Sequence, residues 1–144
     1  MDANFRSISY PHYASSSDSF ASGSEHPGGT SKQAALWQQL LHHLERDRPY
    51  LDLLLMQRHL ADKLSISTRT LCRLVTTFTP DNFNTFINRY RVEEACRLMR
   101  DPAYGHLSVE TLALRAGFNS RGSFYRAFRT IVGTSPSQYR HKKN

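Results

Sequence analysis

The apolar positions of the chain recur at helical spacing from residue 31 onward. The first apolar stripe consists of Leu36, Trp37, Leu40, Leu41 and Leu44. Its period near 3.6 predicts an amphipathic helix over residues 31–47. Thr30 and Gln33 fit a capping box at the start of this helix, and Pro49 follows its end. No segment shows the strict alternation of a half-buried strand, so the pattern predicts an all-α domain.

An internal repeat divides the helical region. Residues 60–67 align with residues 112–120 if the second turn is one residue longer. In each copy a serine (Ser67 or Ser120) stands at the predicted cap of the next helix, and an arginine (Arg73 or Arg126) follows six residues later. Each copy therefore reads as helix, tight turn and capped helix. This is the helix-turn-helix layout, in which the second helix enters a DNA major groove.

The second helix of each copy carries a single apolar stripe. The two stripes consist of Leu71, Leu74, Val75 and Phe78 in the first copy and of Phe124, Ala127, Phe128 and Ile131 in the second. We interpret the aromatic members as core residues rather than as stacking platforms for bases. The opposite faces carry Arg69, Cys72, Arg73 and Thr76 in the first copy and Arg121, Gly122, Tyr125, Arg126 and Arg129 in the second. Gly117, before the second helix, is interpreted as a helix terminator.

A long helix is predicted between the two copies. It covers residues 82–100, with Asp81 as its cap and Asp101-Pro102 at its end. Its apolar residues spread over more than one face, as in a helix packed between two lobes. At about 1.5 Å per residue it measures roughly 28 Å, close to the ~34 Å between successive major-groove openings on one side of B-DNA. Such a spacer could seat both second helices on one duplex face.

The domain organisation follows from these elements. Residues 1–30 contain eight serines and a cluster of glycines, and they bury too little apolar surface to offset their ordering entropy, so we predict a disordered tail. The remainder, residues 31–144, is one domain with four parts. These are a leading helix (31–48), a first lobe (49–80), a linker helix (81–101) and a second lobe (107–142).

Charge is distributed unevenly along the chain. Residues 1–30 carry one arginine against three acids, whereas residues 31–144 carry eighteen lysines and arginines against nine acids. The last acid is Glu110. The basic residues after it are Arg115, Arg121, Arg126, Arg129, Arg140, Lys142 and Lys143. This unopposed run predicts a positive field and hence an anionic partner.

Other function classes find little support in the sequence. Cys72 and Cys96 form no CxxC pair, and we interpret both as reduced thiols. The scattered histidines lack the spacing of a zinc motif, and there is no phosphate loop or paired carboxylate, so we expect no metal, no cofactor and no enzymatic activity. The longest apolar run, residues 53–56, is too short for a membrane span, and no secretion signal is present. We therefore expect a cytoplasmic, nucleoid-associated protein.

Six motifs resemble one known family when they are taken in order. Leu-Ala precedes the first turn, "LCRLV" follows it, and "RVEEACRLM" lies in the linker helix. The second copy contains "LALRAGFNS", "FYRAF" and "VGTSPSQYR". Across residues 60–140 these motifs resemble the DNA-binding domain of the AraC/XylS family of bacterial transcription regulators. The resemblance implies two helix-turn-helix lobes, a homeodomain-like pair, which bind asymmetric double-stranded DNA sites as an activator or a repressor.

The resemblance also implies which residues meet the DNA. The base-facing positions fall on Arg69, Cys72, Arg73, Arg121, Gly122, Ser123 and Arg126. Candidates for contacts with the DNA backbone are Ser67, Thr68, Thr76, Ser120, Tyr125 and Arg129. At Gly122 many relatives have a longer residue, so readout there is either lost or moved to Arg121. Thr79-Pro80-Asp81 replaces the glycine that usually ends the first unit, which leaves the geometry of that turn open.

Two questions stay open at this point. Many relatives carry an effector-sensing domain, and residues 31–60 are more similar to members whose DNA-binding domain follows a membrane-embedded sensor. The chain is therefore either a relative of those sensors or a small free-standing regulator. The alternative function is a basic helical module that binds an acidic partner such as RNA polymerase. That function explains the charge but not the doubled helix-turn-helix.

Overall fold

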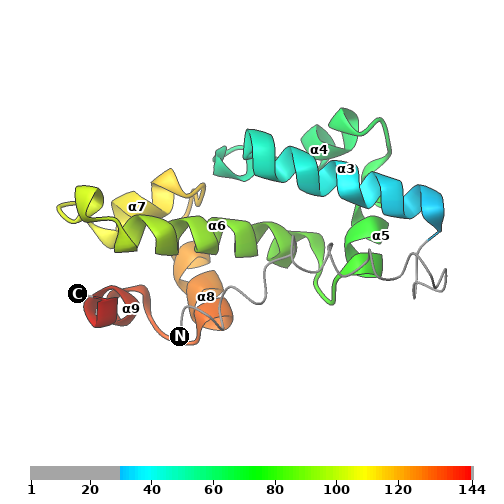
Figure 1. The fold of residues 1–144 in the computed structure, drawn as a ribbon. Helices are drawn as coiled ribbons and strands as arrows, with labels where there is room; N and C mark the ends of the chain where they lie inside the picture. The colour runs from blue at the N-terminus through cyan, green and yellow to red at the C-terminus, as the bar shows by residue number, and fades with distance from the viewer. Residues whose placement is uncertain (1–29, 144) are drawn as a thin grey trace. The chain divides into compact units, whose positions relative to one another are not determined.

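The computed structural model describes residues 30–143, which are helical with no β-strand among them (Figure 1). The described elements are α3 (Ser31–Asp47), η2 (Pro49–Leu51), α4 (Gln57–Lys63), α5 (Thr68–Phe78), α6 (Phe83–Arg100), η3 (Pro102–Tyr104), α7 (Val109–Arg115), α8 (Arg121–Val132) and α9 (Pro136–Lys143). The all-α prediction is confirmed, as is the extra leading helix. The predicted tail lies outside the described residues except for Thr30.

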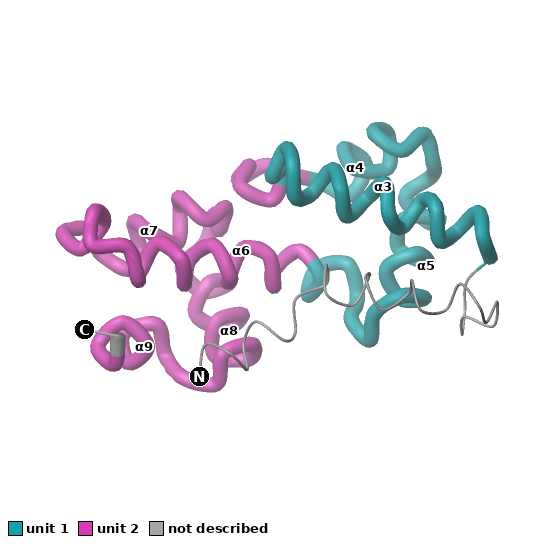
Figure 2. The backbone as a smooth tube through the Cα atoms, in the orientation of Figure 1, with its two compact units in different colours: residues 1–49, 56–86 teal, residues 50–55, 87–144 magenta. Residues whose placement is uncertain are grey.

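The chain forms two compact units, which Figure 2 shows in different colours. Of the described residues, unit 1 comprises 30–49 and 56–86, and unit 2 comprises 50–55 and 87–143. The long helix α6 runs from one unit into the other. Among the described residues, none of the helices combines the length and the apolar character that a bilayer crossing needs.

The leading helix α3 begins and ends at local hydrogen bonds. Thr30 Oγ1 accepts from the backbone N–H of Gln33 at 3.1 Å, and Gln33 Oε1 accepts from the N–H of Thr30 at 3.0 Å. This confirms the predicted capping box. At the other end Arg48 adopts φ 52° and donates its N–H to the carbonyl of Leu44, and Pro49, which has no N–H, cannot continue α3.

Unit 1 is built around the apolar side of α3. Trp37, 1% exposed, stacks on Phe78 of α5 with ring centroids 5.1 Å apart, and it contacts Phe86 at 5.4 Å. The predicted stripe of α5 is fully buried and consists of Leu71, Leu74, Val75 and Phe78. Because α3 supplies the largest side chain of this core, the leading helix is part of the folded unit rather than an appendage.

The predicted repeat is present in the backbone. In α4 and the turn after it, the N–H of Ile66 bonds to the carbonyl of Ala61 at 2.9 Å. In α7 the N–H of Phe118 bonds to the carbonyl of Ala113 at 3.0 Å. Ser65 and Gly117 occupy the same place in the two turns, with φ 59° and 102°. The helix-turn-helix layout is therefore confirmed in both units.

The ends of α5 and α6 differ from the expected ones. Thr79 is extended (φ −139°) and 6% exposed, and its Oγ1 donates to the carbonyl of Val75 at 2.8 Å and accepts from the N–H of Asp81 at 3.1 Å. A threonine side chain thus ends α5, at the turn where the family resemblance led us to expect a glycine. The predicted Asp81 cap of α6 is wrong, because Asn82 Oδ1 accepts from the N–H of Thr85 at 2.9 Å.

Unit 2 contains a segment from earlier in the chain. Residues 50–55, which were expected in the first lobe, form a docked segment held by its backbone carbonyls. Arg91 donates from Nε to the carbonyl of Tyr50 at 2.7 Å and from Nη2 to that of Asp52 at 3.2 Å. Asn119 Nδ2 donates to the carbonyl of Leu53 at 3.2 Å. The segment therefore joins α6 and the turn before α8.

A row of aromatic rings forms the core of unit 2. Phe124 contacts Phe118 and Phe128 with centroids 5.2 and 5.6 Å apart, and Phe128 contacts Tyr139 of α9 at 5.7 Å. Phe124 and Phe128 are fully buried. The interpretation of these rings as core residues rather than stacking platforms is confirmed.

Candidate nucleic-acid interface

The capped helix α5 presents its predicted polar face in unit 1. Ser67 Oγ accepts from the N–H of Thr70 at 3.0 Å, which confirms the predicted cap. Arg69 and Arg73 are exposed, whereas Cys72 is half-buried and its Sγ donates to Gln57 Oε1 at 3.5 Å. Two guanidinium groups, four residues apart, therefore share the exposed face of α5.

The remaining predicted residues of α5 are also on its surface. Ser67, Thr68 and Thr76 are exposed. The hydroxyl of Thr76 donates to the carbonyls of Cys72 and Arg73 at 3.3 and 3.2 Å, and the hydroxyl of Ser67 donates to Thr70 Oγ1 at 3.0 Å. Both hydroxyls thus have local partners, and an outside acceptor has to compete with them.

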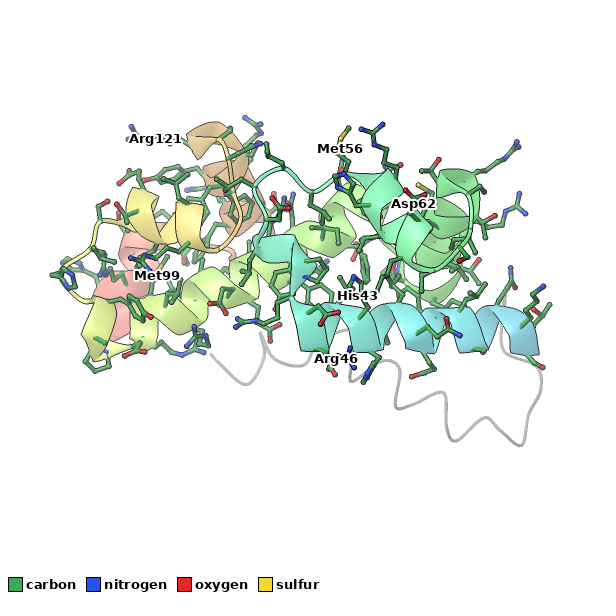
Figure 3. The ribbon with its side chains drawn as sticks, turned by 90° about the horizontal axis from the view of Figure 1, so that it is seen from above. His43, Arg46, Met56, Asp62, Met99 and Arg121 are labelled. Atoms are coloured by element: carbon green, nitrogen blue, oxygen red, sulfur yellow. The ribbon has the colours of Figure 1, made fainter. Side chains whose placement is uncertain are left out.

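In unit 2, the capped helix α8 presents the second predicted set. Ser120 Oγ accepts from the N–H of Ser123 at 3.1 Å and donates to Ser123 Oγ at 3.3 Å. Arg121, Gly122, Arg126 and Arg129 are exposed, and Ser123 and Tyr125 are half-buried. No acid lies in the first turn of α8. The positive end of the helix dipole therefore adds to the charge of Arg121, which lies at this end of the helix (Figure 3).

The absence of a side chain at Gly122 leaves space for the guanidinium group of Arg126. A Cβ at residue 122 would lie 3.2 Å from Nη1 of Arg126 and 4.0 Å from its Cζ. The guanidinium group of Arg126 thus lies against the backbone of the first turn of α8. In the sequence Gly122 suggests only a missing side chain, whereas in the structure a neighbouring arginine uses the vacant space.

Glu110 is a member of this surface that the sequence reasoning missed. Its Oε2 accepts from the hydroxyl of Tyr125 at 2.7 Å and lies 3.4 Å from Nη2 of Arg121. The guanidinium carbon of Arg121 lies 5.7 Å from the centroid of the Tyr125 ring. The sequence shows Glu110 as the last acid of the chain. The direction in which its side chain points depends on how α7 packs on α8.

The pKa values in this cluster reflect the same contacts. The hydrogen bond from Tyr125, with a smaller contribution from the charge of Arg121, lowers the pKa of the Glu110 carboxyl. The pKa of Tyr125 is raised because its hydroxyl donates to Glu110. At neutral pH the carboxylate is therefore charged and the phenol is protonated.

Arg140 has a different role from the exposed arginines. Its Nη1 donates to the carbonyl of Leu107 at 2.6 Å, and its Nη2 donates to the carbonyls of Tyr104 and Gly105 at 3.0 and 3.2 Å. The side chain thus links α9 to the loop before α7. Arg140, one member of the basic run after Glu110, therefore has a structural role within unit 2.

The chain matches a known protein family. The model of a family described as a helix-turn-helix domain matches residues 60–142. This range contains both capped helices, both turns and all the predicted site residues. No match was found among curated protein sequences.

Three solved structures share the fold. A Listeria innocua protein of unknown function is 23% identical, with a TM-score of 0.62, and the alignment covers 73% of this chain and 94% of that one. The C-terminal domain of the two-component response regulator yesN from Fusobacterium nucleatum is 22% identical, with a TM-score of 0.61 and coverages of 72% and 95%. The C-terminal domain of AraT, a response regulator from Geobacillus stearothermophilus, is 23% identical, with a TM-score of 0.59 and coverages of 78% and 86%.

Proposed function

The chain belongs to the AraC-type helix-turn-helix family of DNA-binding regulators, and from this premise we propose that it reads two adjacent major grooves, with α5 and α8 as its recognition helices. The main support for the proposal is that α5 and α8 share the same local structure. Each follows the same turn, begins at a serine cap, buries one apolar stripe and exposes two arginines in its first two turns. This is the geometry of a helix whose N-terminal residues meet base edges.

The proposal assigns base reading to the exposed arginines. An arginine fork that meets guanine O6 and N7 discriminates against the wrong base by about 1 to 3 kcal/mol. We propose this role for Arg69 and Arg73 of α5 and for Arg121 and Arg126 of α8, and further base contacts for Cys72, Gly122 and Ser123. The proposed contacts with phosphates come from Ser67, Thr68, Thr76, Ser120, Tyr125 and Arg129.

The proposed DNA ligand also determines where in the cell the protein would act. A regulator of this kind works where the bacterial chromosome lies, so the proposal places it in the cytoplasm at the nucleoid. A second candidate, a module that binds an acidic protein such as RNA polymerase, requires only the positive charge. It does not require a preference among DNA sequences.

Binding to selected DNA tests the proposal. Duplexes are selected from a random library with the wild-type protein, and affinity is then measured for the selected duplex and for a scrambled version. Alanine at residue 69, 73, 121 or 126 should lower the affinity for the selected duplex by about five- to 150-fold, and the affinity for scrambled DNA by much less.

Arg46→Ala provides the control, since Arg46 lies on α3 and is 69% exposed, close to the 73% of Arg121. Equal losses for all five variants on both duplexes would mean that the arginines act only through the overall field. Failure to enrich any duplex would favour the protein-interaction module.

A further inference from the structure

We propose that Glu110 is a specificity-determining residue, which biases Arg121 toward neutral base edges and against phosphates. This inference rests on the proposed function of α8 as a recognition helix. It concerns the one carboxylate that the described structure places on Arg121, at 3.4 Å from Nη2.

The geometry fixes the carboxylate beside the guanidinium group. The same oxygen, Oε2, accepts the hydroxyl of Tyr125 at 2.7 Å, and Tyr125 lies one helical turn after Arg121. The ring of Tyr125 lies 5.7 Å from the Arg121 guanidinium carbon. Arg121 therefore has an acid and an aromatic ring as neighbours, and its side chain, which is 73% exposed, can still meet a ligand.

Two electrostatic effects at the beginning of α7 keep the Glu110 carboxylate charged. Ser108 caps α7, and Glu110 lies in the first turn of that helix, where the dipole favours an anion. The hydrogen bond from Tyr125 acts in the same direction. A negative charge is therefore present beside Arg121 at neutral pH.

This charge acts differently on the two kinds of DNA acceptor. A phosphate oxygen that approaches Arg121 meets repulsion from Glu110, because both groups are anionic. Guanine O6 and N7 are neutral acceptors and meet no such repulsion. Glu110 thus weakens the contact of Arg121 with phosphates, which every DNA sequence offers. It does not weaken the contact with guanine, which depends on the DNA sequence. Because the pair is exposed, the effect on scrambled DNA should be modest, about two- to fivefold.

Glu110→Gln tests the inference, since glutamine keeps the size of the side chain and removes its charge. Its affinity for a scrambled duplex should rise about two- to fivefold, and its affinity for the selected duplex should rise less, so that the specificity ratio falls. On scrambled DNA, the slope of log K against log salt should steepen by up to about 0.9, the value for one added phosphate contact.

The matched control is Glu45→Gln, which makes the same change of charge at an exposed residue of α3. In the Arg121→Ala background, Glu110→Gln should act no differently from Glu45→Gln. Glu110→Asp keeps the charge but moves it away from Arg121 by one methylene. We therefore expect this variant to lose part of the specificity ratio. If only net charge mattered, the specificity ratio would not change.

The outcomes separate this inference from the proposed function. If wild-type protein does not distinguish the selected duplex from the scrambled one, the proposed function fails. If wild-type protein does distinguish them but Glu110→Gln behaves like Glu45→Gln, the role of Glu110 is overturned while the proposed function stands.

Discussion

Gly117 has no side chain where the backbone carbonyl of Tyr50 approaches it, and a Cβ at residue 117 would overlap that oxygen. The residue also adopts φ 102°, a conformation that L side chains rarely adopt. Two separate requirements therefore select glycine at this turn. One is the end of α7, and the other is the docked segment of residues 50–55.

Gly117→Ala should lower the free energy of unfolding by about 2 to 4 kcal/mol, since backbone strain of about 1 to 2 kcal/mol adds to an overlap of similar size. Gly133→Ala is the matched control, because Gly133 has φ 94° but no atom within 4 Å of the added Cβ. Gly133→Ala should lower the free energy of unfolding only by the backbone strain. Urea unfolding measures both. Equal losses would show that the docked segment moves aside without cost.

Thr79→Val should destabilise the protein by about 1 to 3 kcal/mol. Valine has nearly the same shape, but it removes the donor to the Val75 carbonyl and the acceptor for the Asp81 N–H at a site that is 6% exposed. Thr79→Ser keeps the hydroxyl and should recover most of the loss. If Thr79→Val kept wild-type stability while Thr79→Ser lost it, the methyl group rather than the hydrogen bonds would hold this turn.

The local part of the structure could be predicted from the sequence. The capping box of α3, the serine caps and the apolar stripes depend on residues three or four positions apart, so their pattern is visible without the fold. The stripe of α5 and the rings of α8 are buried as expected. The cap of α6 was missed because Asp81 and Asn82 are both good caps, and only the backbone selects between them.

The long-range contacts could not be predicted in the same way. Charge alone does not show whether an arginine faces solvent, as Arg121 does, or binds carbonyls of the same chain, as Arg91 and Arg140 do. These partners lie more than thirty residues away. The position of Glu110 likewise depends on the packing of α7 on α8, which periodicity does not describe.

Arg140→Ala should lower the stability of unit 2 by about 2 to 4 kcal/mol, because three carbonyls lose a charged donor. Arg140→Lys should recover only part of this loss, since an ammonium group cannot match the spacing of the fork. Thermal unfolding followed by circular dichroism measures both variants. Wild-type stability of Arg140→Ala, together with weaker DNA binding, would instead place Arg140 on the DNA.

DNA binding should depend steeply on salt. If about five to eight basic groups meet phosphates, the slope of log K against log salt lies near −5 to −7. Fluorescence anisotropy with a labelled duplex over a series of potassium chloride concentrations provides this slope. A slope shallower than about −2 would show that the exposed arginines of α5 and α8 do not face the duplex.

Tyr139 should make the protein sensitive to alkali. Burial, with a smaller effect of Cys96, raises the pKa of Tyr139 to about 12 from a usual value near 10, although Arg100 Nη1 donates to its hydroxyl at 2.6 Å. The unfolded chain therefore loses this proton at lower pH than the folded chain does. The stabilising contribution is complete below pH 10 and is lost as the pH rises from about 10 to about 12, by no more than about 2 to 3 kcal/mol.

Tyr139→Phe tests this origin of the pH dependence, because phenylalanine keeps the ring that packs against Phe128 and removes the ionisable group. Between pH 10 and 12 the wild-type protein should lose more stability than the variant does, and the folded wild type should show one tyrosine that ionises late in the ultraviolet absorbance of tyrosinate. Parallel stability curves for the two proteins would mean that Tyr139 ionises as readily in the folded chain as in the unfolded one. In that case water reaches its hydroxyl, and the packing of α9 against α6 is looser than the bond from Arg100 indicates.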